Sequence, residues 1–159
     1  MDIKRNLEII EQQEKILIFD KFDNHDALIL GTKIAENLKD SEKPVAICIW
    51  LNDIPIFKYT MQGKELRHYN WAERKYRMVR ATGHSSFYVM LKHELTGDFK
   101  EYENDEDKAF ACGAFPIQIN EKGIAGVVSI SGLTDPQDHI EVVKALENLC
   151  GKKVPQLIT

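Results

Sequence analysis

Two short polar turns, each flanked by apolar β-forming segments, constrain the fold of this 159-residue chain most strongly. The first lies in VAICIWLNDIPIFKYTM, where NDIP separates two apolar runs. The second lies in AFPIQINEKGIAGVVSISGL, where NEKG does the same. A turn this short joins neighbouring antiparallel strands, so each segment predicts a β-hairpin. The sequence therefore predicts a mainly antiparallel sheet.

Amphipathic helices are expected between the strands. Helical spacing of apolar residues begins at residue 2, resumes after Asp23, and recurs before and after Gly83 and in the segment that follows Pro136. Each helix needs a sheet face to cover, which predicts one sheet with helices on both faces. The strands are expected at about 16–19, 45–51, 54–60, 115–120 and 124–131.

Length and composition predict a single domain over residues 1–159. Its core is expected at about 15–150, after a helix at 1–14 and before a tail at 151–159. The net charge of −4 argues against a nucleic-acid binder. No segment has the roughly 20 apolar residues of a membrane helix, and the N-terminus does not resemble a signal peptide. Three separated cysteines without CxxC spacing predict reduced thiols and a cytoplasmic location.

Positive charge is concentrated in one segment, from Lys64 to Lys92. It holds seven basic and two acidic residues, a net +5, so the rest of the chain carries −9. This asymmetry suggests an anionic partner, either a small ligand or an acidic surface of another subunit; the alternative is a solvated helix face. Arg74 and Lys75 are adjacent and cannot share one narrow helix face, so at least one should meet a neighbour or solvent.

The segment Gly83-His84-Ser85-Ser86 invites a catalytic interpretation, because a histidine stands beside serines. A catalytic serine also needs an oriented base and an oxyanion hole, and the chain has no GxSxG motif. Serines at a helix start are typical N-caps, and a preceding glycine is a typical helix end. The segment therefore predicts a helix break whose new N-terminus offers free amides to an anion.

The histidines do not predict a metal site. They lack HxxxH or HExxH spacing, and Asp138-His139 lies in a first helical turn, where the helix dipole alone explains an aspartate. Any histidine could ligate haem iron axially, and the sequence does not select one of the five. They are His25, His68, His84, His93 and His139.

Several motifs together resemble the GlcG-like, HbpS-like family, in its branch of small cytosolic proteins. They span about Phe19 to Leu149 and are FDNHDALILG, NWAERKYRMV, GHSS, AFPIQI and GVVSISGLTDPQDHIEVVKAL. The resemblance implies a profilin-like α/β/α sandwich with a five-stranded antiparallel sheet, a homo-oligomer, and haem or corrinoid binding in some relatives. One departure is that the family's His-Gly-Gly run before Phe-Pro reads Ala111-Cys112-Gly113 here.

These observations lead us to expect a non-catalytic, oligomeric binding protein for an anionic ligand such as haem. Arg74 and Lys75 would pair with ligand carboxylates, and His84 is the preferred histidine. The alternatives are an enzyme acting on a small anionic metabolite with His84 as general base, and a pure assembly role. The expected ligand-binding residues are Trp71, Arg74, Lys75, Gly83, His84, Ser85, Ser86, Phe115, Pro116, Asp138 and His139.

Overall fold

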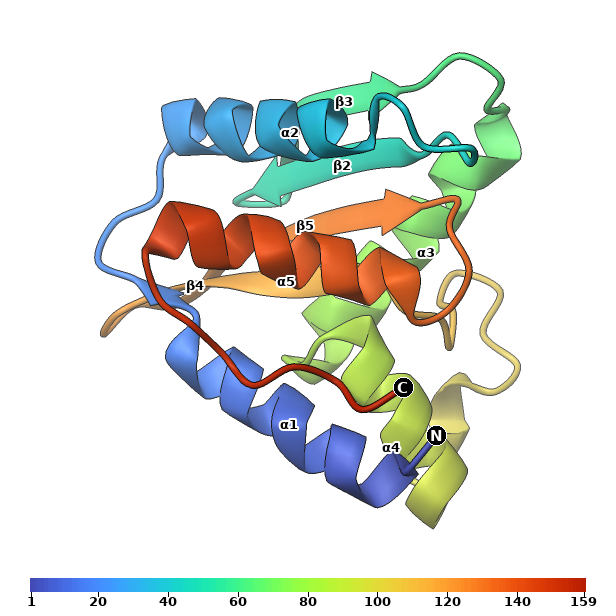
Figure 1. The fold of residues 1–159 in the computed structure, drawn as a ribbon. Coiled ribbons are helices and arrows are strands. Elements are labelled where there is room, and N and C mark those ends of the chain that lie inside the picture. Colours follow the sequence, from blue (N-terminus) through green and yellow to red (C-terminus); the bar gives the residue numbers. More distant parts are fainter.

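The computed structural model describes residues 1–159 and places one sheet between two layers of helices (Figure 1). The strands are β1 Ile18–Phe19, β2 Ala46–Leu51, β3 Ile54–Thr60, β4 Ala114–Ile119 and β5 Gly123–Ser131. The helices are α1 Ile3–Ile16, α2 Asn24–Leu38, α3 Leu66–Thr82, α4 Ser86–Thr96 and α5 Gln137–Cys150, with a 3-10 turn, η1, at Lys100–Tyr102. None of the helices combines the length and the apolar composition needed to cross a membrane.

The sheet has the strand order β1-β4-β5-β2-β3. Strands β2 and β3 form one antiparallel hairpin, and β4 and β5 form the other. The hairpins join through an antiparallel β2–β5 ladder, in which Ala46 faces Ser131. Only β1 is parallel to its neighbour, with Ile18 opposite Gln118. The predicted five-stranded, mainly antiparallel α/β/α sandwich is confirmed.

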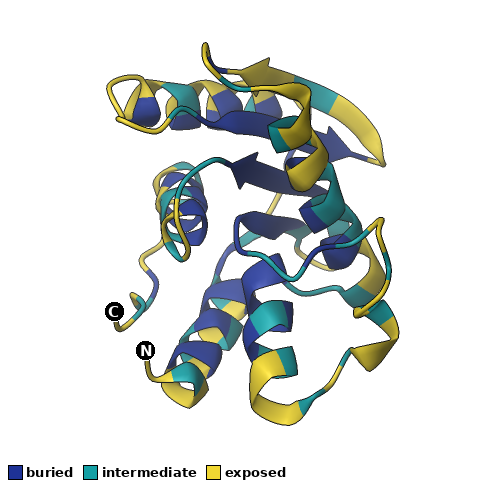
Figure 2. Ribbon diagram, turned by 90° about the vertical axis from the view of Figure 1, so that its right-hand side faces the viewer, coloured by how far each residue is buried: buried dark blue, intermediate teal, exposed yellow.

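The two faces of the sheet bury alternate residues of each strand, because successive side chains point to opposite sides. Ile47 and Ile49 of β2 lie in the largest apolar cluster, which α2 and α5 cover. Cys48 and Trp50 lie in a smaller cluster on the opposite face, under α3. The central strands are accordingly buried on both faces (Figure 2).

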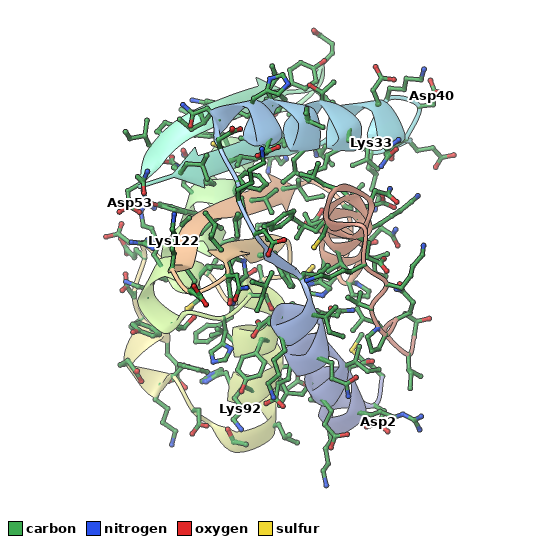
Figure 3. The ribbon with its side chains drawn as sticks, turned by 90° about the vertical axis from the view of Figure 1, so that its left-hand side faces the viewer. Asp2, Lys33, Asp40, Asp53, Lys92 and Lys122 are labelled. Atoms are coloured by element: carbon green, nitrogen blue, oxygen red, sulfur yellow. The ribbon has the colours of Figure 1, made fainter.

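Helices α1 and α4 pack against each other beside the sheet and bury a third apolar cluster. Leu7 and Ile10 of α1 meet Phe87 and Leu91 of α4 there. The tail after Gly151 has no regular secondary structure and passes between α5 and α1, so both chain ends lie near α4 (Figure 1). The charged residues labelled in Figure 3 lie at the outside of the molecule, and they are Asp2, Lys33, Asp40, Asp53, Lys92 and Lys122.

Candidate functional site

The predicted helix break is present between α3 and α4. Gly83 ends α3 in the left-handed conformation, with φ 76°, and its N–H donates to the Val79 carbonyl at 2.8 Å. Ser85 is the N-cap of α4, and its Oγ accepts from the Tyr88 N–H at 3.3 Å. His84 lies between the two helices, at the point where the chain turns.

A carboxylate of the same chain occupies the N-terminus of α4. Glu14, in the last turn of α1, accepts the Ser85 N–H through Oε1 at 2.6 Å. Its Oε2 lies 2.8 Å from His84 Nδ1. Glu14 is 7% exposed, so this contact is largely shielded from water. The anion that the free amides were expected to attract is therefore Glu14.

His84 borders an open cavity of about 350 Å³, which we call the His84 cleft. The imidazole is 39% exposed and stacks on the Tyr88 ring, with centroids 4.1 Å apart. Glu14 raises the pKa of His84 above its ordinary value, chiefly through their hydrogen bond. The cleft is lined by Glu11, Glu14, Lys15, Ile18, Gly83, His84 and Gln118.

The hydrogen bonds of His84 differ from those of His93 and His68. A carboxylate only accepts, so His84 Nδ1–H donates to Glu14 and the neutral ring keeps a free lone pair on Nε2. His93 has acceptors at both ring nitrogens. His68 accepts a backbone N–H at Nδ1, so its neutral ring carries the proton on Nε2. His84 Nδ1 is thus hydrogen-bonded to Glu14, whereas its Nε2 is available to a ligand.

Lys75 and Asp138 form a buried ion pair. Lys75 is 2% exposed, and its Nζ lies 3.4 Å from Asp138 Oδ2. The ammonium also donates to the carbonyls of Cys112, at 2.9 Å, and Ile130. Asp138 Oδ1 accepts the Leu133 N–H at 3.0 Å. The carboxylate that Lys75 was expected to find in a ligand is supplied by the protein.

Trp71 and Arg74 form a separate surface feature of α3. The Arg74 guanidinium lies 4.4 Å from the centroid of the Trp71 ring and donates to the Lys108 carbonyl at 2.9 Å. Neither residue lines the His84 cleft. Farther along α3, Arg80 pairs with Asp53 at 2.8 Å. Part of the positive charge of this segment is therefore neutralised within the chain.

Several other expected ligand-binding residues lie in the interior. Ser85 and Ser86 are fully buried, and Ser86 Oγ accepts the Ala114 N–H at 3.0 Å. Phe115 belongs to the main core, and Pro116 is buried within β4. These four residues support the turn and the sheet and do not line the cleft.

His139 is buried and does not line the His84 cleft. Its Nε2–H donates to Gln13 Oε1 at 2.8 Å, and its ring packs beside Phe87 and Phe115. Burial lowers the pKa of His139 to about 3, so the ring is neutral. The two histidines share no cavity, but Gln13 and Glu14, which bind them, are consecutive residues.

The contribution of α1 to the cleft was not predicted from the sequence. Glu11, Glu14 and Lys15 come from this helix, and Gln118 comes from β4. Glu14 lies at helical spacing from Leu7 and Ile10, on the buried stripe of α1. A carboxylate on an apolar stripe was the available signal, since a buried charge needs a partner.

Comparison with known proteins gives consistent matches along the chain. The family model described as haem degrading protein HbpS-like matches residues 22–147. A UPF0303 protein of Streptomyces coelicolor is 34% identical over 146 residues, covering 90% of this chain and 92% of that protein. A UPF0303 protein of Rhizobium rhizogenes is 35% identical over 161 residues, covering 99% and 98%.

Solved structures match the fold. The crystal structure of Ybr137w protein has a TM-score of 0.83 and 34% identity, covering 91% of this chain and 87% of that one. HbpS has a TM-score of 0.65 at 12% identity, covering 80% and 89%. A PduOC:heme complex has a TM-score of 0.66 at 16% identity, covering 85% and 99%. The last two similarities concern the fold alone.

Proposed function

Since the chain belongs to the HbpS-like family, we propose that it is a binding protein for haem or a related tetrapyrrole, held at the His84 cleft. One observation carries the proposal. His84 donates from Nδ1 to a shielded carboxylate, and its other nitrogen has no protein partner. The solved PduOC:heme complex, which shares the fold, supports a tetrapyrrole as the ligand class.

The hydrogen bond between His84 and Glu14 suits a histidine that would ligate the iron of a tetrapyrrole. Metal-binding histidines usually donate their second ring N–H to a carboxylate or carbonyl, which fixes the tautomer and raises ligand basicity. Glu14 takes this position behind His84. His84 would hold a bound haem through Nε2, and the haem would supply a Lewis-acidic iron. Glu14 would hold the proton at Nδ1 and so keep Nε2 available.

Other residues of the cleft would orient the ligand. Ile18 provides an apolar wall, and Lys15 provides a cation for a ligand carboxylate. Tyr88 stacks on His84 and donates to Glu11 at 3.3 Å, which restrains the imidazole plane. In this proposal Lys15 takes the role that the sequence suggested for Arg74 and Lys75.

Hemin titration tests the proposal. The wild-type chain should give a saturable Soret shift, and His84→Ala should abolish it. His25→Ala is the matched control, because His25 is an exposed histidine of α2 that lies outside the cleft. A titration without saturation, or an equal shift in His84→Ala, would rule out ligation by His84.

An enzyme acting on a small anionic metabolite is the second candidate. A carboxylate that orients a histidine also suits a general base, so the Glu14–His84 contact favours this role as well. The two candidates separate in a metabolite screen: the enzyme predicts turnover that His84→Ala removes, and the binding protein predicts none.

We also propose that the chain forms a homo-oligomer. Leu28 and Ile29 are 52% and 44% exposed on α2, and Ile29 borders an apolar cavity of about 210 Å³ between α2 and α5. Exposed apolar side chains of this kind favour burial in a subunit contact. Native mass spectrometry of the purified protein would report the subunit number and any retained ligand together. A purely monomeric spectrum would contradict the proposal.

The cytoplasm is the location we propose. Cys48, Cys112 and Cys150 are free cysteines, and the first two are buried. Burial raises the pKa of Cys48 to about 12, so this thiol remains protonated at neutral pH. Free thiols are typical of a reducing compartment. Fractionation of the cells that make the protein, followed by immunodetection, tests this location.

A further inference from the structure

The C-terminal tail is held against α1 by side-chain amides that bind its main chain. Asn6 donates to the Ile158 carbonyl and accepts the Ile158 N–H, both at 2.8 Å. Gln13 donates to the Pro155 carbonyl at 2.7 Å. Asn6 and Gln13 are 0% and 1% exposed, although both are polar. Two buried amides of one helix therefore depend on the tail for hydrogen bonds.

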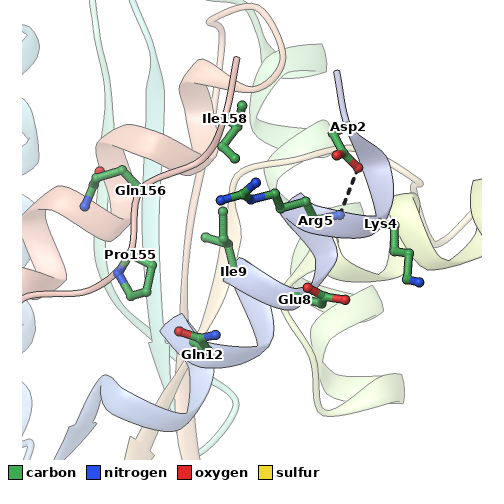
Figure 4. A pocket seen from close by; sticks show the side chains of 9 residues that line it. All are labelled: Asp2, Lys4, Arg5, Glu8, Ile9, Gln12, Pro155, Gln156 and Ile158. Atoms are coloured by element: carbon green, nitrogen blue, oxygen red, sulfur yellow. Dashed lines mark hydrogen bonds between the residues drawn. The ribbon is translucent and has the colours of Figure 1, made fainter.

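Helix α5 holds the start of the same tail. Glu147 accepts the Val154 N–H at 3.0 Å, and Val154 is 8% exposed. Beside the tail lies a cavity of about 680 Å³, whose lining includes Ile9 and Gln12 of α1 and Gln156 of the tail (Figure 4). The tail thus bridges α5 to α1 over nearly the full length of α1.

The contacts of Gln13 connect the tail to the His84 cleft. Its Nε2 binds Pro155 and its Oε1 binds His139, so both ends of the amide are fixed. The next residue, Glu14, reaches the other way to His84 and Ser85. An unpaired buried amide is unfavourable, so loss of the tail contact should let this turn of α1 shift.

We infer that the docked tail is a positioning strap for the His84 cleft, which holds Gln13 and thereby keeps the Glu14 carboxylate on His84. Gln13 and Asn6 are then positioning residues, since neither lines the cleft. The functional meaning of the strap rests on the proposed role of His84, whereas the strap itself can be tested on the protein alone.

The test is an NMR titration of the His84 imidazole in the ligand-free chain. The charged groups that face His84 are Glu11, Glu14 and Lys15 of α1 and Lys92 of α4. Glu14 is the largest influence, so a shift of α1 that removes it should lower the His84 midpoint.

Two pairs of variants separate the strap from general destabilisation. Gln13→Ala should lower the His84 midpoint, and Gln12→Ala, the same change at the exposed neighbour, should leave it unchanged. Ile158→Pro removes the N–H that Asn6 accepts and should also lower the midpoint, by a smaller amount. Ile158→Ala keeps that N–H and should match the wild type.

Each outcome decides the inference. A lower midpoint in both test variants, with unchanged controls, supports the strap. A lower melting temperature with an unchanged midpoint means that the tail only stabilises the fold, and overturns it. If Gln13→Ala does not fold, Ile158→Pro decides alone. Failure of hemin binding would remove the proposed function but would leave this titration valid.

Discussion

Lys75 of α3 and Asp138 of α5 start on opposite faces of the sheet and meet in the interior, with Nζ 3.4 Å from Oδ2. The pair connects the two helical layers, and it does so at Gly113, where an added Cβ would lie 2.9 Å from each partner. Lys75 and Asp138 were predicted to bind a ligand, and in the structure their ion pair stabilises the sandwich.

Breaking this pair should strongly destabilise the protein. Lys75→Met leaves Asp138 as an uncompensated buried charge, which typically costs about 3–5 kcal/mol. Removing both charges, in Lys75→Met/Asp138→Leu, should be less harmful than the sum of the two single changes. Urea unfolding of the four proteins measures this coupling, and strictly additive losses would contradict it.

Substitution of Gly113 should be far more damaging than substitution of Gly123. Both have positive φ, at 122° and 82°, so alanine is strained at either position. At Gly113 the new Cβ would also lie 2.6 Å from the Ile130 carbonyl oxygen, whereas at Gly123 it meets nothing within 4 Å. We expect Gly123→Ala to cost about 1 kcal/mol and Gly113→Ala at least twice as much in urea unfolding.

Stability should fall as the pH rises above the ordinary pKa of histidine, because of His84. Its folded pKa is raised by Glu14, so the folded chain holds this proton more tightly than the unfolded chain. The contribution is complete below pH 6.5, the unfolded value, and is lost as the pH rises through the folded value. Glu14→Gln should flatten this part of the curve of unfolding free energy against pH. An unchanged slope would show that Glu14 does not set the titration.

The affinity for hemin should increase as the pH rises toward the pKa of His84. The proton on Nε2 of the imidazolium competes with iron, so affinity should rise about tenfold per pH unit below the His84 pKa and then level off. Spectroscopic titrations at several pH values give the midpoint. Glu14→Gln should move that midpoint to lower pH, and binding independent of pH would argue against His84 as the ligand.

His139 should make the protein sensitive to acid, with the opposite sign. Burial lowers its folded pKa to about 3, so only the unfolded chain takes up this proton between pH 6.5 and about 3. Stability should fall with decreasing pH by up to about 1.4 kcal/mol per unit in that range. His139→Asn, whose amide can still donate to Gln13, should reduce the slope. Equal slopes for both proteins would show that His139 is not responsible.

The features that the sequence predicted are those set by neighbours along the chain. Both hairpins follow from their turns, and the break at Gly83 and the cap at Ser85 follow from local backbone chemistry. Lys75 was assigned to a ligand because it lies in a positive segment. Lys75 also lies at helical spacing from Ala72 and Val79, which are both buried, and this spacing indicated a buried position for Lys75.

The contacts that form the cleft could not be predicted in this way. Glu14 reaches His84 across 70 positions, because α1 packs on α4 through Leu7 and Ile10. No pattern in the sequence specifies that packing. The contact between the tail and Asn6 could not be predicted either, because it joins residues near opposite ends of the chain.

The order of strands in the sheet has a consequence for the path of folding. Each hairpin can form locally, but the β2–β5 ladder that unites them must close a loop containing β3, α3, α4 and β4. The chain loses entropy when a long loop closes, before the contacts that stabilise the closed loop have formed. Such loops therefore slow folding. We expect the rate-limiting barrier to lie at the meeting of two preformed hairpins, where the ladder that pairs Ala46 with Ser131 is formed.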